Sequence, residues 1–348
     1  MAIPVFRPSI KRKDMDAVLT CLVSDQLGPG SYGEGLVHDL LERIDADAGV
    51  LLRERLRGIE LGFQALELKA GDRVAVSPLS DMGYYFVARR MGLEPVLIDV
   101  QESAPVMDFE ILEKLHGENA FSALVLDHPL GFSPETETVS ELNIPIFQDA
   151  SNILSYQSDG GCIGDCILVS MEPENLITSG GGIFLASKTR KRSKLLNAAV
   201  EAYPQDIYLP DMNAALGGMQ VKELKSFITS REELKSVVVQ QAMQGRHRVL
   251  SSDDQIVPSY LALFLQSPMQ DVIQYAVKKQ VEIRPAFEKS VITSLLRDFD
   301  SGSEEGSSPA ELYPQASSYS LRSVVLPLYP SLSRKELDIM LKVVKTLP

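Results

Sequence analysis

The sequence has few cysteines and no excess of positive charge. Its 348 residues contain three cysteines, Cys21, Cys162 and Cys166, which cannot all pair and are typical of a reducing compartment. Cys162 and Cys166 lack a second Cys/His pair at zinc-ligand spacing, which disfavours a zinc site. The net charge of −13, from 34 basic and 47 acidic residues, disfavours nucleic acid and anionic membranes as main partners, because both reward a basic face.

Long apolar runs and nucleotide-binding motifs are also missing. No run approaches the roughly 20 apolar residues that a bilayer span requires, and residues 1–8 contain no apolar signal core. The chain has no Walker loop, dinucleotide fingerprint or metal-ligand cluster. We therefore expect a soluble, cytoplasmic protein that binds neither nucleic acid, membrane nor metal. With 45% hydrophobic and 23% charged residues, its composition is that of a globular protein with a large and a smaller domain.

Short apolar runs that alternate with helical segments predict an α/β fold. The predicted strands are near-continuously apolar, as parallel strands buried on both faces are; they cover residues 74–76, 95–100, 123–127, 144–147 and 166–170. Segments 83–91, 108–115 and the region around residue 140 fit as crossover helices. Helices are also predicted at 13–23 and 51–68. The second of these has an apolar stripe formed by Leu52, Leu56, Ile59, Phe63 and Leu66.

The C-terminal third has a different pattern. A long amphipathic helix is predicted over residues 213–239, strands over 259–264 and 281–284, and a closing helix over 333–346 that opens with a capping-box sequence. The Ser/Gly/Glu-rich segment 298–309 predicts a mobile loop. The basic run 188–194 is interpreted as a solvated helix face. We predict a large domain over residues 1–235 and a small α+β domain over 236–348.

Polar residues stand where several predicted strands end. They are Asp99, Asp127 with His128, Asp149, and Ser170. Ligands of open parallel sheets bind beyond the carboxyl ends of the strands. Any one of these residues could be a turn or cap residue, but together they predict a pocket at this edge.

Several segments, taken in order, resemble the sugar aminotransferases of the DegT/DnrJ/StrS type. These are pyridoxal-phosphate enzymes that aminate keto-sugar nucleotides. The resemblance covers nearly the whole chain and rests on residues 3–8, 24–30, 70–74, 92–100, 127–131, 148–151, 163–166, 179–182, 213–217 and 326–330. It implies the aspartate-aminotransferase-like fold, with a mostly parallel seven-stranded sheet in the large domain, and a dimer built through the large domains.

The resemblance implies a vestigial site. Asp149 corresponds to the aspartate that protonates the cofactor's ring nitrogen. Ser170 corresponds to a serine five residues before the family's Schiff-base lysine, which places Asn175 at the lysine position. An amide nitrogen is not nucleophilic, because its lone pair is delocalised, so Asn175 cannot form the imine on which this chemistry depends. Either Tyr84 or Tyr85 corresponds to the aromatic residue that stacks on the cofactor ring.

The phosphate-binding positions are changed as well. The family's Ser-Gly-Thr aligns with residues 54–56, where Glu54 opposes a phosphate and Arg55 partly offsets it. The family's Asn-Tyr-Arg, which reaches into the partner's site, aligns with Asp206, Ile207 and Tyr208. A histidine near the lysine becomes Glu172. Unpaired anions facing a buried dianion are costly, so we expect weak or absent binding of pyridoxal phosphate and no cofactor.

Three functions follow from the resemblance. The first is a catalytically degenerate homologue that retains a sugar or sugar-nucleotide ligand in the old cleft, lined by Tyr84, Tyr85, His128, Asp149, Asn152 and Ser170. The second is an active aminotransferase or dehydratase that holds pyridoxal or pyridoxamine phosphate non-covalently. The third is a regulatory partner of an active paralogue. A homodimer is expected for the first function, and a hetero-oligomer for the third.

Overall fold

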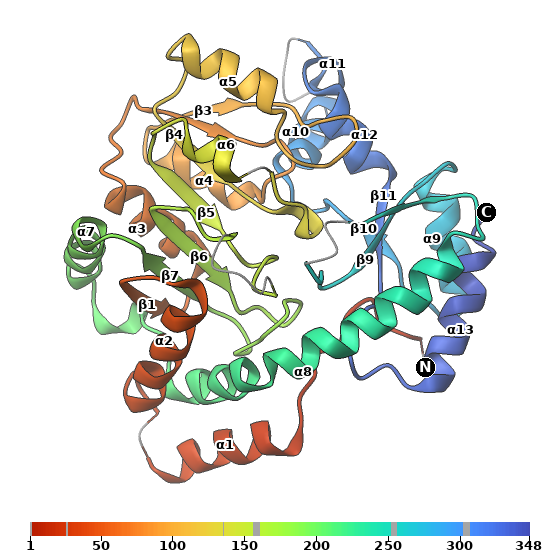
Figure 1. Ribbon diagram of the computed structural model, residues 1–348, viewed down its shortest axis with the longest axis horizontal. Helices are drawn as coiled ribbons and strands as arrows, with labels where there is room; N and C mark the ends of the chain where they lie inside the picture. The colour runs from red at the N-terminus through yellow and green to blue at the C-terminus, as the bar shows by residue number, and fades with distance from the viewer. Residues whose placement is uncertain (1, 26, 135, 156–160, 252–255, 302–306) are drawn as a thin grey trace.

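The computed structural model describes residues 2–25, 27–134, 136–155, 161–251, 256–301 and 307–348. Two β-sheets occupy opposite halves of the molecule, and the long helix α8 (Asp211–Ala242) runs from one half to the other (Figure 1). Among the described residues, no helix has the length and apolarity needed to cross a bilayer.

The larger sheet has seven strands in the order β1-β7-β6-β5-β4-β2-β3. They are β1 (Ala48–Leu52), β2 (Arg73–Val76), β3 (Glu94–Leu97), β4 (Ala123–Leu126), β5 (Ile146–Asp149), β6 (Cys166–Ser170) and β7 (Ile183–Ser187). Five neighbouring strands, β3, β2, β4, β5 and β6, run parallel to one another. β7 pairs antiparallel with β6 and with β1. All residues of β4, β5, β6 and β7 are buried, as expected for strands covered on both faces. This confirms the predicted α/β fold with a mostly parallel seven-stranded sheet.

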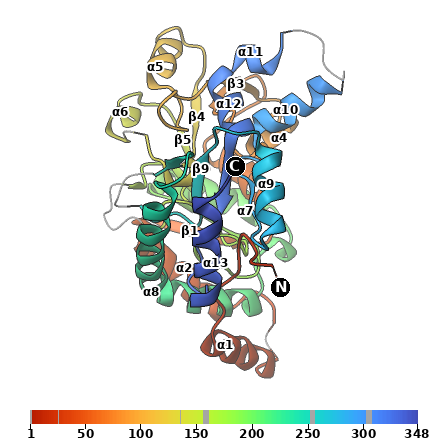
Figure 2. The ribbon, with the colours of Figure 1, turned by 90° about the vertical axis from the view of Figure 1, so that its right-hand side faces the viewer.

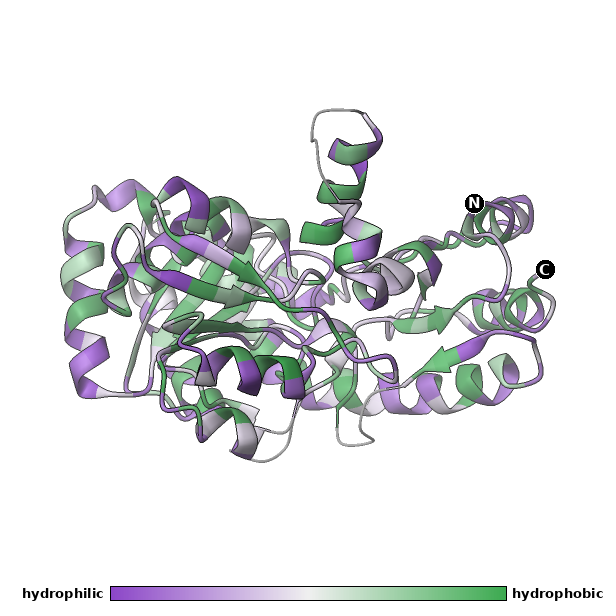
Figure 3. Ribbon diagram, turned by 90° about the horizontal axis from the view of Figure 1, so that it is seen from above, coloured by the Kyte–Doolittle hydropathy of each residue, from purple (hydrophilic) through white to green (hydrophobic). Residues whose placement is uncertain are grey.

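Helices cover both faces of this sheet. One face packs against α3 (Arg55–Ala65), α4 (Met82–Arg90) and α7 (Arg190–Glu201). The other packs against α2 (Ser31–Ile44), α5 (Phe109–Gly117), α6 (Thr136–Ser140) and the first half of α8. Hydrophobic and hydrophilic residues alternate in bands along the helices, as their amphipathic packing requires (Figure 3). A further helix, α1 (Arg12–Val23), lies below α8 and confirms the first predicted helix.

The predicted helix at 51–68 is wrong at its start. Leu51 and Leu52 belong to β1 and pair with Phe184 and Ile183 of β7, a strand that the sequence pattern missed. Helix α3 begins only at Arg55. Leu52 is fully buried by this strand pairing, whereas Leu56 of the predicted stripe is 42% exposed. Pairing with a distant strand therefore overrides the local helical periodicity.

The smaller sheet is antiparallel, in the order β10-β11-β9-β8. Its strands are β8 (Arg248–Leu250), β9 (Leu261–Phe264), β10 (Arg284–Pro285) and β11 (Ser323–Leu326). Its core includes residues of α9 (Met269–Lys278), α13 (Arg334–Lys345) and the second half of α8. Ser333 forms the predicted capping box at the start of α13. The N-terminal Ile3 pairs with Val281 beside this core, and the domain division at residue 235 stays a prediction.

Two further predictions in the C-terminal third need correction. The strand predicted at 281–284 is reduced to β10 and a single bridge at Val281, which pairs with Ile3. The two ends of the predicted loop at 298–309 are helical: α10 (Val291–Asp300) ends in it, and α11 (Pro309–Leu312) begins at its last residue. Residues 302–306 lie outside the described residues. Helices α10, α11 and α12 (Pro314–Arg322) lie together at one end of the molecule (Figure 2).

Candidate functional site

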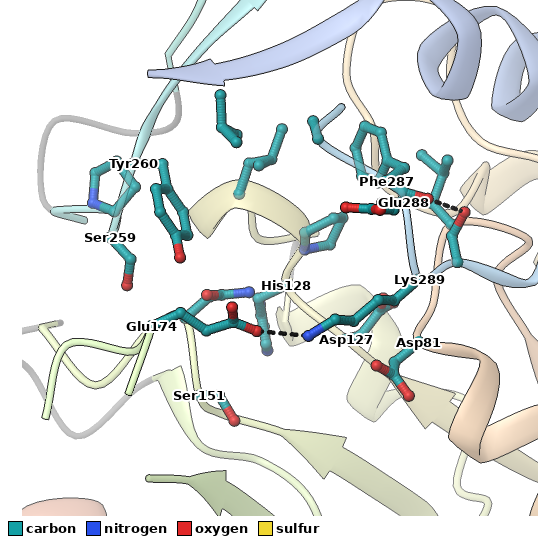
Figure 4. A pocket seen from close by; sticks show the side chains of 18 of the residues that line it. Asp81, Asp127, His128, Ser151, Glu174, Ser259, Tyr260, Phe287, Glu288 and Lys289 are labelled. Carbon is teal, nitrogen blue, oxygen red and sulfur yellow. Dashed lines mark hydrogen bonds and ion pairs between the residues drawn. The ribbon is translucent and has the colours of Figure 1, made fainter. Parts of the chain in front are cut away.

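A cavity of about 280 Å³ lies where β2, β4 and β5 end, between the two sheets (Figure 4). The wall on the side of the larger sheet comes from the segments that follow these strands and from the start of α3, and includes Arg55, Asp81, Tyr84, Asp127, His128, Asp149 and Asn152. The wall on the side of the smaller sheet comes from the segment after β10, which carries Lys289, and from Ser259 and Tyr260 before β9. The carboxyl edge of the sheet is where a ligand site is expected in this architecture.

Asp149 and Arg55 form the inner end of the cavity. Nη2 of Arg55 lies 2.7 Å from Oδ2 of Asp149, and the Tyr84 hydroxyl donates to the same oxygen at 2.9 Å. Oδ1 of Asp149 accepts hydrogen bonds from the backbone N–H and the hydroxyl of Ser151 at 3.1 and 2.5 Å. Both carboxylate oxygens therefore already have two donors each.

The ion pair is strongly shielded from water. The side chains of Asp149 and Arg55 are 11% and 24% exposed. Burial acts to raise the pKa of Asp149, but the Arg55 guanidinium and the Ser151 donors outweigh it and lower that pKa below its usual value. Burial likewise opposes the charge on Arg55, and the negative charge of Asp149 nevertheless raises its pKa. Both groups are ionised at neutral pH.

Asp127 and His128 follow β4, and burial disfavours the charged form of both side chains. Burial and the charge of Asp149 raise the pKa of Asp127 to about 7. Burial lowers the pKa of His128 to about 4. The amide nitrogen of Gln148 lies 2.8 Å from Nε2 of His128, and the Gln148 amide oxygen is fixed by the backbone N–H groups of residues 163 and 164. The Gln148 amide thus donates to Nε2, and the neutral imidazole carries its proton on Nδ1.

Asn175 lies in the turn after β6, at the rim of the cavity. Its amide nitrogen donates to the carbonyl oxygen of Ser170 at 3.0 Å, so its side chain holds the turn.

Three consecutive glycines, residues 180–182, lead into β7 with φ values of 78°, 129° and 90°. Side chains rarely adopt this conformation, and a Cβ at Gly182 would lie 2.9 Å from the Leu52 carbonyl oxygen.

Lys289 and Glu174 form the outer end of the cavity. Lys289 Nζ lies 2.8 Å from Glu174 Oε1, and Figure 4 shows the two side chains pointing toward one another. Their side chains are 71% and 36% exposed. The hydrogen bond to Glu174 raises the pKa of Lys289 above its usual value, which keeps the amine protonated. The Lys289 carbonyl oxygen accepts from the Met82 N–H at 2.9 Å, so the segment is anchored to the large domain.

The structure brings most of the predicted site residues together. Tyr84, His128, Asp149, Asn152 and Asn175 all line the cavity. Tyr85 is half-buried, and Ser170 is buried behind Ser151, to whose hydroxyl it donates its N–H at 2.8 Å; neither is a lining residue. Asp99 lies elsewhere, where its carboxylate accepts from the first N–H groups of α12.

Four other positions with altered chemistry are not among the residues that line the cavity. Glu54 is the exposed N-cap residue of α3, directly before Arg55. Glu172 is half-buried near Gly181. Asp206 belongs to a short 3₁₀ turn, and Tyr208 pairs with Leu52 at the end of β1.

Two cations at the cavity were not predicted as site residues. Lys289 has no motif around it, and it reaches Glu174 from 115 residues further along the chain. Arg284 lies in β10 on the same wall. Arg55 was singled out only as a partial offset to Glu54; its pairing with Asp149, 94 residues away, could not be read from spacing. The one available signal was an arginine at the start of a helix that faces the carboxyl edge of the sheet.

Comparison with known proteins gives the family. The sequence profile of the DegT/DnrJ/EryC1/StrS aminotransferase family matches residues 8–345. The chain is 25% identical, over 67% of each chain, to UDP-4-amino-4-deoxy-L-arabinose--oxoglutarate aminotransferase from Shewanella sediminis. The putative sugar aminotransferase Spr1654 of Streptococcus pneumoniae, solved in its PMP form, superposes with a TM-score of 0.86 at 19% identity, covering 100% of this chain and 98% of the other.

A dehydratase has the same fold. GDP-4-keto-6-deoxy-D-mannose-3-dehydratase of E. coli, with bound hydrated PLP, superposes with a TM-score of 0.84 at 14% identity and covers 99% of this chain and all of the other. At such identities the likeness establishes the fold, while the profile match over nearly the whole chain establishes the family. The chain therefore belongs to the DegT/DnrJ/EryC1/StrS aminotransferase family, whose fold is shared by pyridoxal-phosphate-dependent sugar aminotransferases and dehydratases.

Proposed function

We propose that this chain is a catalytically degenerate member of its family, which performs no transamination and retains its cleft for a sugar or sugar-nucleotide ligand. The observation that carries the proposal is the buried pair between Arg55 and Asp149. The guanidinium of Arg55 pairs with the carboxylate of Asp149, which by the resemblance would face the cofactor's ring nitrogen.

The residues at the inner end do not fit pyridoxal phosphate. Both oxygens of Asp149 already accept two hydrogen bonds. A protonated ring nitrogen would have to displace Arg55 and would then lie beside an unpaired guanidinium. Breaking a buried pair costs about 3–5 kcal/mol, because it leaves one charge without compensation.

The phosphate side gives the same result. The resemblance assigns the phosphate to the start of α3, where Glu54 is the N-cap residue and Arg55 turns to Asp149. Among the described lining residues, the carboxylates of Asp81, Asp149, Glu174 and Glu288 stand against three cations, Arg55, Arg284 and Lys289, and Asp127 is only partly ionised near neutral pH. An excess of carboxylates disfavours a dianion in a partly dehydrated site.

No amine in the cavity is prepared to attack an aldehyde. Asn175 stands at the position that the resemblance assigns to the lysine, and its amide is engaged with the Ser170 carbonyl. Lys289 is the lysine of the cavity wall, and its ammonium group is held by Glu174 with a raised pKa. A protonated amine has no lone pair for nucleophilic attack.

The same lining suits a polyhydroxylated ligand. Asp127 and Glu174 can accept hydrogen bonds from sugar hydroxyl groups, and Asn152 can both donate and accept. Tyr260 and Phe287 provide apolar area on the opposite wall (Figure 4). A few polar groups converging in a concave, partly apolar site are typical of small-molecule binding.

Cofactor retention tests the loss of activity. Purified protein is incubated with excess pyridoxal phosphate, desalted, reduced with borohydride and analysed by peptide mass spectrometry. We expect no retained cofactor and no pyridoxyl-lysine adduct. A stoichiometric adduct on any lysine of the cavity, or amino-donor turnover after desalting, would refute the proposal, and Lys289→Met identifies whether an adduct resides on that lysine.

A pair of engineered variants sharpens this test. Asn175→Lys alone is expected to retain no cofactor, because Arg55 still holds Asp149. Asn175→Lys combined with Arg55→Gly and Glu54→Ser frees that carboxylate and restores a neutral helix start, so we expect measurable retention. Equal retention by both variants would mean that the Arg55–Asp149 pair is irrelevant to cofactor exclusion.

Ligand retention is tested separately, by thermal shift with UDP- and GDP-linked sugars and their free sugars. We expect stabilisation by at least one of them and its loss in Asn152→Leu, with the distant Asn143→Leu as the matched control. Absence of any shift would contradict the binding half of the proposal.

The second candidate is an enzyme that holds its cofactor non-covalently. The observation that favours it is the fold shared with the dehydratase that was solved with hydrated PLP. Retention of cofactor without any lysine adduct, together with turnover, would support this candidate in place of the first.

We further propose a cytoplasmic homodimer. Helix α1 exposes several apolar side chains, among them Leu19 at 56% and Val23 at 82%, and a second copy could cover them. If the chain instead regulates an active paralogue, it would elute as a monomer alone and as a complex on co-expression. Size-exclusion chromatography with light scattering distinguishes the two assemblies.

A further inference from the structure

Arg231 of α8 is a buried cation that has no counter-ion among the described residues. Arg231 is 5% exposed, and neither its Nε nor its Nη1 has a hydrogen-bond partner among the described residues. No carboxylate in the described part of the chain lies within ion-pair distance of it. Burial lowers the pKa of Arg231 to about 10, so the guanidinium stays charged at neutral pH. An uncompensated buried charge costs several kcal/mol.

Three hydroxyl groups that line the same cavity as Arg231 are also buried and lack a hydrogen-bond partner among the described residues. Arg231 lines a small cavity with Ser9, Ser259 and Tyr329. The hydroxyl oxygens of all three are buried and have no hydrogen-bond partner among the described residues. Ser259 and Tyr329 are 7% and 2% exposed. Buried polar atoms are nearly always paired, so four unpaired groups around one cavity indicate an occupant.

The nearest ionic side chains do not neutralise Arg231. Glu174 also lines the cavity, but its carboxylate pairs with Lys289 on the side of the main cleft. Arg7, a further lining residue, lies over the Tyr329 ring at 5.1 Å and pairs with Glu336. The unpaired groups of the cavity are therefore one cation and three hydroxyls, all of which can donate hydrogen bonds.

The size of the cavity restricts the occupant. It measures about 10 Å³, which is near the space of a single water-sized occupant and too small for a polyatomic anion. A water molecule would satisfy hydrogen bonds but would leave the charge of Arg231 uncompensated. A monoatomic anion satisfies both, because it accepts from the guanidinium and from the hydroxyls.

We infer that this cavity binds a single chloride ion between Arg231, Ser9, Ser259 and Tyr329. The ion connects three parts of the chain that are far apart in sequence: the N-terminal segment, α8, and the small domain with Ser259 and Tyr329. Glu174, Asn175 and Ser259 line both this cavity and the main cleft. The bound chloride stabilises the packing of these segments beside the cleft, whether or not the cleft holds a cofactor.

Thermal unfolding in different anions tests the inference. At constant ionic strength, replacement of sodium gluconate by sodium chloride is expected to raise the unfolding midpoint by about 1–3 °C and then to saturate, as single-site binding requires. In Arg231→Met this dependence disappears. Tyr329→Phe, which removes one donor, is expected to require several-fold more chloride for the same shift.

Arg322→Met is the matched control, since Arg322 is satisfied by the Leu265 carbonyl at 3.0 and 2.8 Å. It should keep the chloride dependence of the wild type. An equal chloride dependence in the wild type and Arg231→Met, or none in the wild type, would overturn the inference.

Crystals of the wild-type protein grown in sodium bromide give a readout that does not depend on any variant folding. Anomalous scattering is expected to place one bromide ion within hydrogen-bond distance of Arg231 Nε or Nη1. A water molecule at that position with no anomalous signal would exclude the anion site.

Discussion

The two ends of the cleft contain ion pairs of the same length and very different surroundings. Arg55 and Asp149 are separated by 2.7 Å at the inner end, and Lys289 and Glu174 by 2.8 Å at the outer end. Asp149 is 11% exposed and Lys289 is 71% exposed. Distance alone therefore does not rank these pairs. Removing one partner leaves an uncompensated buried charge only at the inner end, whereas water replaces the lost partner at the outer end.

The largest effect is expected at the inner end. Asp149→Asn removes the counter-charge of Arg55, so we expect the free energy of unfolding to fall by about 3 kcal/mol, measured by urea denaturation at pH 7. Arg55 retains only Asp81, whose carboxylate lies 3.8 Å from Nε.

The control is the double variant Arg55→Leu with Asp149→Asn, which removes both charges. It should recover a large part of the loss, because no buried charge is left unpaired. A single variant that loses less than about 1 kcal/mol would mean that the inner pair is no stronger than an exposed one.

A pH-dependent effect of comparable size, spread over the window from about pH 4 to about pH 7, is expected at Asp127. Its pKa of about 7 in the folded chain lies above the ordinary value of 3.8. Between these values the folded state binds the extra proton, so the contribution of Asp127 to stability falls as the pH rises from 4 to 7. Asp127→Asn cannot ionise. Its stability relative to the wild type should therefore rise over this window by about 2–4 kcal/mol and stay constant above it.

Urea denaturation of both proteins at several pH values measures this difference. His128 has the opposite trend, because burial lowers its pKa to about 4 and stability rises with pH as the unfolded histidine loses its proton. Since His128 is present in both proteins, its contribution cancels in the comparison. A difference that does not change with pH would mean that Asp127 titrates normally.

The smallest effect is expected at the outer end. Glu174→Gln should change the free energy of unfolding by less than about 0.5 kcal/mol at neutral pH, because both partners are well solvated. A double-mutant cycle with Lys289→Met isolates the pair from other changes. A coupling energy above about 2 kcal/mol would show that the two ends of the cleft are held equally firmly.

Much of the fold could be predicted from the sequence, because the central parallel strands are apolar along their whole length. β1 and β7 could not, since Leu51 and Leu52 also fit a helical stripe, and only their pairing with Phe184 and Ile183 distinguishes the two structures. Strand pairing over more than 130 residues leaves no local signal.

The positions of the candidate site residues in the fold were predictable to the same degree. Asp149, Asp127 and His128 stand directly at strand ends, and their position follows from the topology of a parallel sheet. The partners of these residues come from helix starts and from the other domain. Arg55 and Lys289 are therefore known only when the chain is folded.

The length of α8 has a consequence for how the molecule can move. Its 32 residues correspond to a rod of about 48 Å at 1.5 Å per residue. Its first half packs in a hydrophobic core of the larger sheet, and its second half packs in the core of the smaller sheet. Rotation of one half against the other would require this rod to bend or to slide out of a packed core. Amide protons of the two sheets should consequently exchange with solvent in the same cooperative unfolding event, because one helix belongs to the cores of both halves.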